Sequence, residues 1–229
     1  MMLRRAILLG LSTAFLCGPA GAHDIITTKV TWSKEISRLL YRRCASCHAE
    51  GQSAFSLMSW DEARPWAKAM KEETGARRMP PWQAVKGFGD FKGDRGLTQE
   101  EIELIADWVE GGAPEGDPKF LPARPKREPW QDPALPARSS AVVASDSLRL
   151  KSAAHAIAVR PRDLAKGSSV QVIATHPDGT VEPLIWIYRY DPKFARTYYY
   201  RVPLDLPAGT VIGMSLPGAG TFTLFSVRP

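Results

Sequence analysis

The sequence predicts a multidomain α + β protein, in which a small all-α domain precedes an all-β antiparallel sandwich. Between residues 31 and 112, apolar side chains recur at helical spacing behind two capping-box sequences. From residue 141 onward the apolar pattern has a period of two, and β-branched and aromatic residues are frequent. A chain of 229 residues is long enough for two small domains. We therefore expect a helical first half and a β second half.

Residues 1–22 are typical of a signal peptide. Two arginines precede an apolar run over residues 6–17, and Ala20-Gly21-Ala22 forms a small-x-small cleavage site. The apolar run is too short to span a bilayer. We therefore expect cleavage before His23, no membrane span and a mature protein in the periplasm.

Three helices are expected between residues 23 and 118. The first begins near Thr31 and is capped by Thr31 or Ser33. The second and third follow capping boxes at residues 59–62 and 98–101. Pro65 lies past the first turn of the second helix, so it should kink or break that helix.

Cys44-Ala45-Ser46-Cys47-His48 is the stretch that points to chemistry. Its two thiols and its imidazole stand at i, i+3 and i+4, so one helical turn can present all three on one face. C-x-x-C-H is the attachment motif of a c-type haem. Cys44 and Cys47 would form the thioethers, and His48 would bind the iron. Residues 23–118 are therefore predicted to form a cytochrome c domain with one covalent haem c.

This motif has three other interpretations. A C-x-x-C pair can be a redox dithiol or half of a zinc site, and it can also be a structural disulfide beside an incidental histidine. Cys17 leaves with the signal peptide, so the mature chain has no further cysteine to complete a tetrahedral zinc site. The histidine directly after the second cysteine favours haem.

Met79 is the predicted sixth ligand of the haem iron. It lies in Arg77-Arg78-Met79-Pro80-Pro81-Trp82, where the two prolines stiffen the loop that carries it. A methionine thioether favours reduced iron and raises the reduction potential. An open or water-bound sixth position is the alternative. The rival methionines are Met58, Met70 and Met214.

Side chains around this loop are candidates for other contacts to a haem. Arg77, Arg78 and Trp82 could donate hydrogen bonds to the propionates, although the arginines could equally be ordinary solvated charges. Phe88 and Phe91 lie in the glycine-rich stretch that follows, and we expect them to cover the porphyrin.

Residues 119–140 are predicted to be a proline-rich linker, and residues 141–229 to be the sandwich. Pro177-Asp178-Gly179 and Pro207-Ala208-Gly209 are typical turns between strands. The expected strands cover residues 147–151, 155–160, 169–175, 183–190, 197–202, 209–216 and 221–227.

Several motifs together resemble a bacterial family. They are Val30-Thr31-Trp32, the CASCH motif, Ala63-Arg64-Pro65-Trp66-Ala67-Lys68, RRMPPW, Asp94-Arg95-Gly96-Leu97-Thr98 and Gly112-Ala113-Pro114-Glu115-Gly116-Asp117. Members of this family fuse an exported cytochrome c domain to a domain similar to the C-terminal sandwich of copper type II ascorbate-dependent monooxygenases, the peptidylglycine monooxygenase fold. The resemblance covers nearly the whole mature chain and implies His48 and Met79 as the axial ligands.

The resemblance also raises the question of copper. Residues 176–187 and 200–204 look like that monooxygenase sandwich, but the His-x-His pair that follows an Arg-Pro in complete members is absent after Arg160-Pro161. Only one of the two sandwiches of those enzymes is present. Copper is therefore not expected. His155 could be a remnant ligand, but a strand histidine without a metal is the preferred interpretation. His176 is expected to face solvent, and an N-terminal His23 could chelate copper.

The sequence favours an electron carrier over an enzyme. Single electrons would pass between a donor and an acceptor redox protein through the haem, with the sandwich as a docking module and no catalytic residue. The alternatives are a copper-dependent monooxygenase-like oxidoreductase fed by its own haem, and a haem-bearing subunit of a larger redox complex. No basic block interleaved with aromatic residues points to nucleic acid, and the sequence does not define the oligomeric state.

Overall fold

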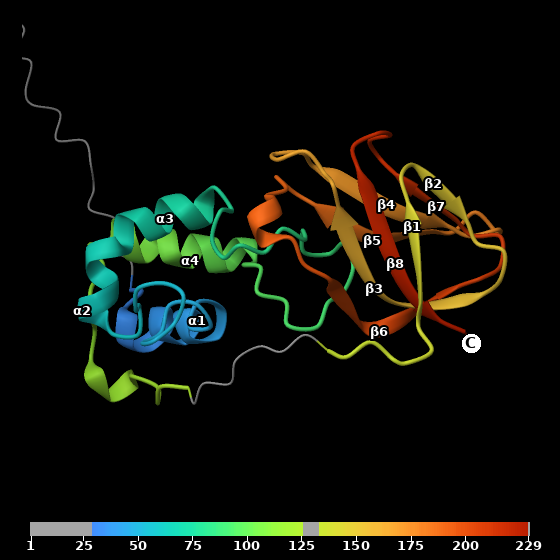
Figure 1. Cartoon of the computed structure of the whole chain (residues 1–229). Helices are drawn as coiled ribbons and strands as arrows, with labels where there is room; N and C mark the ends of the chain where they lie inside the picture. The colour runs from blue at the N-terminus through green and yellow to red at the C-terminus, as the bar shows by residue number, and fades with distance from the viewer. Residues whose placement is uncertain (1–28, 126–132, 229) are drawn as a thin grey trace, which may run out of the picture.

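The computed structural model describes residues 29–125 and 133–228. The predicted signal peptide, its cleavage site and His23 lie outside the described residues. The protein is mixed: helices occupy its first half, and two antiparallel sheets form a β-rich C-terminal region (Figure 1). In the part of the chain that the structure describes, no helix is both long enough and apolar enough to cross a membrane.

The helices follow the predicted order with shorter pieces. A π-helical turn, η1, continues directly into α1, and α2 and α3 are separated by one 3₁₀ turn, η2. Pro65 lies in that turn, so the predicted interruption is confirmed. The bounds are η1 Trp32–Ile36, α1 Ser37–Arg43, α2 Trp60–Ala63, η2 Arg64–Trp66, α3 Ala67–Gly75, α4 Gln99–Glu110, η3 Pro118–Phe120 and η4 Pro192–Phe194.

All three predicted helix starts are confirmed. Ser59 and Thr98 are N-caps of complete capping boxes, with Glu62 and Glu101 as their partners. The first helix also begins directly after Thr31 as predicted, but without a side-chain capping bond.

At that first helix, Thr31 is the N-cap residue, but its side chain makes no capping hydrogen bond. Its backbone N–H donates instead to Glu35 Oε2 at 3.0 Å. The Ser33 hydroxyl donates to the Glu115 carbonyl at 2.8 Å. Neither hydroxyl therefore caps the helix, and the carboxylate of Glu35, one turn into the helix, accepts the hydrogen bond at its start.

The start of the first helix packs across α4. The rings of Trp32 and Trp108 lie 6.2 Å apart, and both side chains are buried. The Gly112–Asp117 stretch lies beside them, since the Trp108 indole donates to the Pro114 carbonyl at 3.0 Å and the Trp60 indole to the Ala113 carbonyl at 2.9 Å. This corner places the end of α1 beside the N-terminus of α4.

The β-rich region consists of two four-stranded antiparallel sheets. One has the strand order β1-β8-β3-β6 and the other β2-β7-β4-β5. Buried side chains of both sheets form one core, so the region is a β-sandwich. The bounds are β1 Ser140–Ala144, β2 Ser147–Arg149, β3 Ala154–Arg162, β4 Val170–Thr175, β5 Val181–Ile187, β6 Tyr198–Leu206, β7 Val211–Met214 and β8 Thr221–Val227.

Seven of these eight strands were predicted, β8 with its observed bounds and the other six with shifted ends, and β1 was not among the predicted strands. The period-two pattern holds best in β4, where buried and partly buried residues alternate strictly. β1 pairs only with β8 and is mostly exposed, so it lacks the strong alternation that marks an interior strand.

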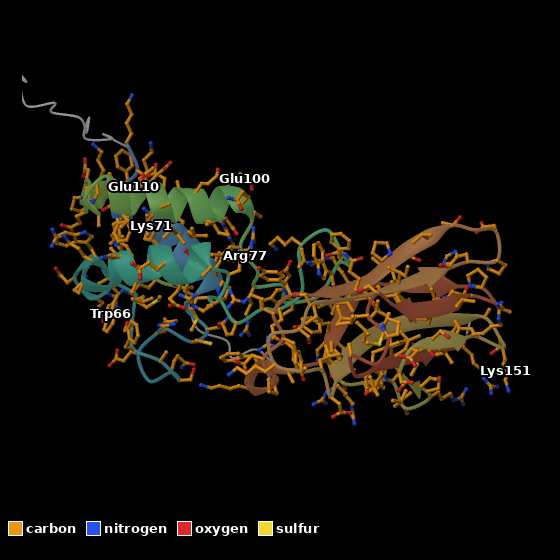
Figure 2. The ribbon with its side chains drawn as sticks, turned by 90° about the horizontal axis from the view of Figure 1, so that it is seen from above. Trp66, Lys71, Arg77, Glu100, Glu110 and Lys151 are labelled. Carbon is orange, nitrogen blue, oxygen red and sulfur yellow. The ribbon has the colours of Figure 1, made fainter. Side chains whose placement is uncertain are left out.

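Residues 83–92, which we call the edge segment, belong to the sandwich. Ala84 forms a β-bridge with Ile187 of β5, and Phe91 forms one with Tyr200 of β6, so the segment pairs with an edge of each sheet. Figures 1 and 2 show this stretch running from the helices to the strands.

The prediction that Phe91 covers a porphyrin is therefore wrong. Phe91 is 3% exposed and stacks on Tyr200 in the sandwich core, with ring centroids 5.3 Å apart. Phe88 contacts Trp186 of β5 edge to face at 4.7 Å. These two phenylalanines therefore pack against residues of the edge strands of the sandwich.

Candidate functional site

The CASCH motif forms one helical turn directly after α1. The Cys44 carbonyl accepts hydrogen bonds from the N–H groups of Cys47, at 3.0 Å, and of His48, at 2.9 Å. Both cysteines are free thiols. The two thiols and the imidazole therefore share one turn, which is the spacing that a c-type haem attachment requires.

Two arginines attach this turn to the start of α4. Arg42 and Arg43 both donate to Glu101 Oε1, at 2.8 and 3.1 Å. Arg43 also donates to the Asp94 carbonyl at 2.9 Å. Glu101 is the carboxylate of the α4 capping box, so the same residue fixes the beginning of α4 and the turn that carries the thiols.

The environment of Cys44 is unlike that of a reactive cysteine. Burial raises the pKa of the Cys44 thiol to about 12, the nearby Cys47 and Glu101 act in the same direction, and Arg43 opposes them. Redox and metal-binding cysteines need a lowered pKa, because the thiolate is the reactive form. This arrangement does not favour a reactive dithiol.

One nitrogen of the His48 ring is already engaged. His48 Nδ1 lies 2.9 Å from the Phe55 carbonyl oxygen. A carbonyl can only accept, so Nδ1 carries the proton, and the lone pair of Nε2 is left for a metal. Metal-binding histidines generally hold their other nitrogen in this way, which fixes both tautomer and ring orientation.

An exposed aromatic pair lies beside His48. The Phe55 ring meets the His48 ring edge to face at 4.9 Å, and it stacks on Trp66 at 4.4 Å with ring planes 26° apart. Phe55 is 48% and Trp66 45% exposed. The two stacked aromatic rings therefore form an exposed apolar surface next to a free imidazole nitrogen.

Met79 is the most exposed of the described methionines. Met58 and Met214 are buried in the helical and sandwich cores, and Met70 packs against the helical core. Met79 is 39% exposed. Packing therefore engages the three rivals and leaves the thioether of Met79 accessible.

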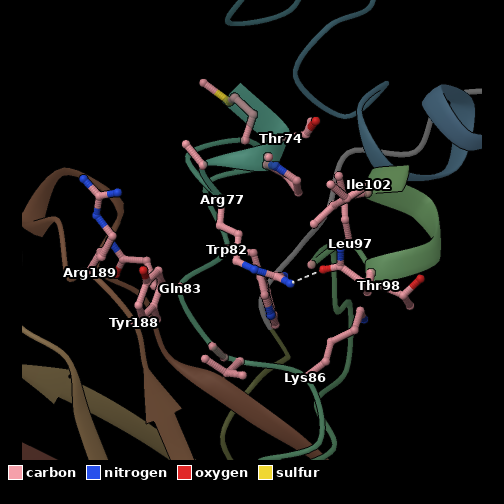
Figure 3. Close-up of a pocket in the computed structure, with 18 of the residues that line it drawn as sticks. Thr74, Arg77, Trp82, Gln83, Lys86, Leu97, Thr98, Ile102, Tyr188 and Arg189 are labelled. Atoms are coloured by element: carbon pink, nitrogen blue, oxygen red, sulfur yellow. Dashed lines mark hydrogen bonds between the residues drawn. The ribbon is translucent and has the colours of Figure 1, made fainter. Parts of the chain in front are cut away.

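Met79 lines a cavity of about 560 Å³ between the helices and the sandwich (Figure 3). Its walls come from the C-terminal end of α3, the loop after it, the start of α4 and the end of β5. This volume lies in the usual range for small-molecule and cofactor sites, roughly 300–1,000 Å³. Arg77 and Trp82 line it as well, whereas the residues of the CASCH turn do not.

The three predicted propionate contacts have protein partners. Arg77 donates to Gln99 Oε1 at 3.0 Å, the bond drawn in Figure 3. Arg78 donates twice to Glu73, at 2.7 and 2.8 Å. Both arginines are exposed, so these pairs can exchange for other anions.

Trp82 faces the sandwich. Its ring contacts Tyr198 of β6 edge to face at 5.1 Å, and the Arg196 guanidinium lies 5.4 Å from the indole centroid. Trp82 thus lines the cavity from the sandwich side.

The structure does not bring all predicted residues to one point. The CASCH turn reaches the N-terminal end of α3 through Phe55 and Trp66. Met79 follows the C-terminal end of the same helix. The CASCH turn and Met79 therefore lie beside opposite ends of α3.

The remaining described histidines lie on the sandwich. His155 Nδ1 contacts Asp205 Oδ1 across the β3–β6 pair, and His176 Nε2 lies 3.5 Å from Glu182 Oε2. His176 is partly buried rather than solvent-facing, with 15% of its side chain exposed, so that expectation is wrong. Within residues 29–125 and 133–228, no group of three or more His, Cys, Asp or Glu side chains is placed to hold a metal ion.

Comparisons with known proteins add little to this geometry. No family model matches the chain, and no curated protein matches it. Among solved structures, the chain is similar to the Drosophila NLP core, which is described in terms of pentamer formation and histone binding. That similarity has 12% identity and a TM-score of 0.29, and it covers 38% of this chain and 94% of the other. A likeness at this level carries no argument.

Sequence reasoning missed Phe55 and Trp66. Phe55 lies in the loop over 51–57 that follows the CASCH motif, and it was not among the predicted site residues. The available signal was an aromatic residue in an otherwise small and polar loop, together with a tryptophan beside Pro65 on a helix. Neither position shows a periodicity that would mark it as buried core.

Proposed function

We propose that this protein is a periplasmic monohaem c-type cytochrome that transfers single electrons between redox partners. The observation that carries the proposal is the CASCH turn, in which two free thiols share a helical turn with a histidine whose Nδ1 is held by a carbonyl. The proposal includes an export signal and a cytochrome c domain over residues 23–118, within which the edge segment pairs with the sandwich.

Each residue of the site has a defined role in this proposal. Cys44 and Cys47 would bind the haem covalently, His48 Nε2 would be one axial ligand, and the Met79 thioether would be the other. When bound, the haem would supply reversible one-electron exchange at its iron. The Phe55 carbonyl holds the His48 ring, and Arg43 holds the turn against α4.

The aromatic pair beside His48 supports this assignment. Phe55 and Trp66 present an apolar surface that a porphyrin could cover, which would remove nearly half-exposed aromatic rings from water.

A redox protein donor and a redox protein acceptor are the proposed partners. The sandwich would serve for docking, and copper is not part of the proposal.

The test is expression of the full chain with a bacterial haem-maturation system, followed by mass measurement of the mature protein and counts of iron and copper. We expect one haem mass that survives acidified organic solvent, one iron per chain and cleavage before His23. Replacing both Cys44 and Cys47 by alanine should abolish the added mass. Cys17→Ala, which alters the thiol of the leader, should leave the added mass unchanged.

Two results would contradict the proposal. One is a colourless mature protein with two unmodified thiols. The other is stoichiometric copper that is lost in a His155→Ala variant, which would favour the monooxygenase-like alternative. Co-purification with a fixed set of partner subunits would instead identify a subunit of a larger redox complex.

A further inference from the structure

The loop that carries Met79 is held at both ends by different halves of the molecule. On the helical side, the N–H groups of Arg78 and Met79 donate to the Glu73 carbonyl of α3, at 2.9 and 3.2 Å. On the other side, Tyr188 N–H donates to the Gln83 carbonyl at 2.9 Å. Only Pro80, Pro81 and Trp82 separate Met79 from Gln83, and prolines restrict the backbone between the two attachments.

The attachment to the sandwich continues along the whole edge segment. Val85 N–H donates to the Trp186 carbonyl at 2.8 Å, on the β5 edge. Farther along, Lys92 N–H donates to the Tyr199 carbonyl and Arg201 N–H to the Asp90 carbonyl, both at 2.8 Å, on the β6 edge. The segment therefore joins an edge of each sheet.

Buried side chains hold the edge segment in place against the two sheets. The Gln83 side chain is buried and donates to the Asp191 carbonyl at 3.0 Å. Ala84 and Phe91 are 5% and 3% exposed within the sandwich core. An added strand that buries its own side chains in the core cannot slide without exposing them.

We propose that the β-sandwich positions the Met79 thioether, with Gln83 and the edge segment as the positioning residues. The inference rests on the proposed function, in which Met79 binds the haem iron. The sandwich fixes the backbone at Gln83, and α3 fixes the other end of the loop at Met79. Because the two prolines between them restrict the backbone, the position of Gln83 limits where Met79 can lie. Loosening the edge segment should therefore alter the sixth ligand of the iron without touching the CASCH turn.

Two glycines of the edge segment offer a matched test. Gly89 has φ +85°, and a Cβ there would lie 2.5 Å from the Phe91 ring and 2.7 Å from the Leu184 carbonyl oxygen of β5. Gly87 has the same φ, but a Cβ there would have no atom within 4 Å. Gly89→Ala and Gly87→Ala therefore share the backbone strain, and only the first wedges the segment off the sandwich.

The measurements are the sulfur-to-iron charge-transfer band, the reduction potential and hydrogen exchange of residues 83–92, on full-length protein with haem attached. For Gly89→Ala we expect faster exchange, partial loss of the band and a lower potential, since a lost thioether ligand lowers the potential. Gly87→Ala should keep the band and the potential. Covalent haem should be retained in both.

A milder variant guards against failure to fold. Gln83→Ala removes only the side-chain hydrogen bond to Asp191, and it should lower the potential in the same direction by a smaller amount. The inference is overturned if Gly89→Ala and Gln83→Ala speed exchange of the edge segment while the band and the potential stay at their original values. A wild-type protein without haem would contradict the proposed function instead, so the two failures are distinguishable.

Discussion

Met79 differs from the other described methionines in what surrounds its sulfur. Met58 and Met214 lie inside the two cores, and Met70 packs on the helical core from α3. A thioether in a core is surrounded by carbon and cannot reach a metal without repacking. Met79 is the exposed one, two residues after Arg77, whose backbone has φ +55° and reverses the chain at the end of α3. This reversal directs the chain away from the helix axis.

Met79→Ala should remove the sixth ligand while leaving the covalent haem in place. We expect loss of the sulfur-to-iron charge-transfer band and a fall in reduction potential, because the thioether stabilises reduced iron. Absorption spectra of the ferric protein and a redox titration measure both. Met70→Leu is the matched control, since it keeps apolar volume on α3 and should change neither quantity. An unaltered spectrum for Met79→Ala would move the ligand to another residue.

At the residue scale, the sequence could identify the proposed attachment residues but not the groups that support them. The spacing of Cys44, Cys47 and His48 is local, so the primary structure contains it fully. The carbonyl that holds His48 Nδ1 belongs to Phe55, seven residues later in a loop without periodicity. Any residue type has a backbone carbonyl, so no side-chain pattern could have pointed to that position.

The N-terminus of α4 is the element that connects the site to the helical core. Glu101 Oε2 accepts from the Thr98 N–H at 2.9 Å, and Glu101 Oε1 accepts from Arg42 and Arg43. Burial of the Glu101 carboxyl alone would raise its pKa, but the hydrogen bonds from Thr98, Arg42 and Arg43 outweigh it and hold the pKa below its ordinary value. The charged carboxylate is therefore the form that the fold stabilises.

Glu101→Gln should weaken the fold at neutral pH and flatten its response to acid. A carboxyl with a lowered folded-state pKa adds stability above its unfolded pKa, about 4.3, and this stability is lost as pH falls through the folded value. We expect a loss of about 1–2 kcal/mol at pH 7, because charge-assisted hydrogen bonds disappear. The gap between the variant and the original protein should be smaller at pH 3 than at pH 7, because it narrows once the pH falls below the unfolded pKa.

Urea unfolding at pH 7 and pH 3 measures this difference. Glu103→Gln serves as the control, because Glu103 is on the same helix and accepts a hydrogen bond from the exposed Gln99 side chain at 3.0 Å. The control should stay within about 0.5 kcal/mol of the original protein at both pH values. An equal loss at pH 3 and pH 7 for Glu101→Gln would contradict the assigned role of its charge.

At the scale of elements, capping chemistry was predictable and pairing was not. Two capping boxes were found correctly because Ser or Thr followed by Glu three residues later is a local signature. The first helix failed this rule, since its start is satisfied by Glu35 and by the distant Glu115. The edge segment was also missed, because a short stretch that pairs across sheets shows no alternation of its own.

For the whole molecule, the order of a helical half and a β half follows from the change in apolar period. What the period could not show is that the two halves share a segment. Phe91 was interpreted from its glycine-rich surroundings as a residue near a cofactor, whereas burial between Tyr198 and Tyr200 decides its place. Contacts separated by more than one hundred residues depend on the folded arrangement of both strands, which no local pattern encodes.

This shared segment makes the stability of the two halves depend on each other. Phe91 is anchored in the sandwich core, and three residues later the Asp94 carbonyl accepts from Arg43 at the end of α1. The Asp94 carboxylate also accepts hydrogen bonds from Lys86 at 2.5 Å and from the Gly96 N–H at 2.7 Å. Asp94 and Gly96 come shortly before the start of α4. Phe91→Ala should therefore loosen both the sandwich edge and the corner between α1 and α4.

We expect Phe91→Ala to reduce the free energy of unfolding by about 3–5 kcal/mol, as for other buried phenylalanines, and to affect both halves. Hydrogen exchange at increasing urea, read separately for α4 and for β5, measures the two midpoints. Both should fall together in Phe91→Ala, while Phe120→Ala, which truncates a ring that is 43% exposed, should move neither. If only β5 lost protection and α4 kept its midpoint, the halves would be independent, and a haem on the helical half could not sense the state of the sandwich through this segment.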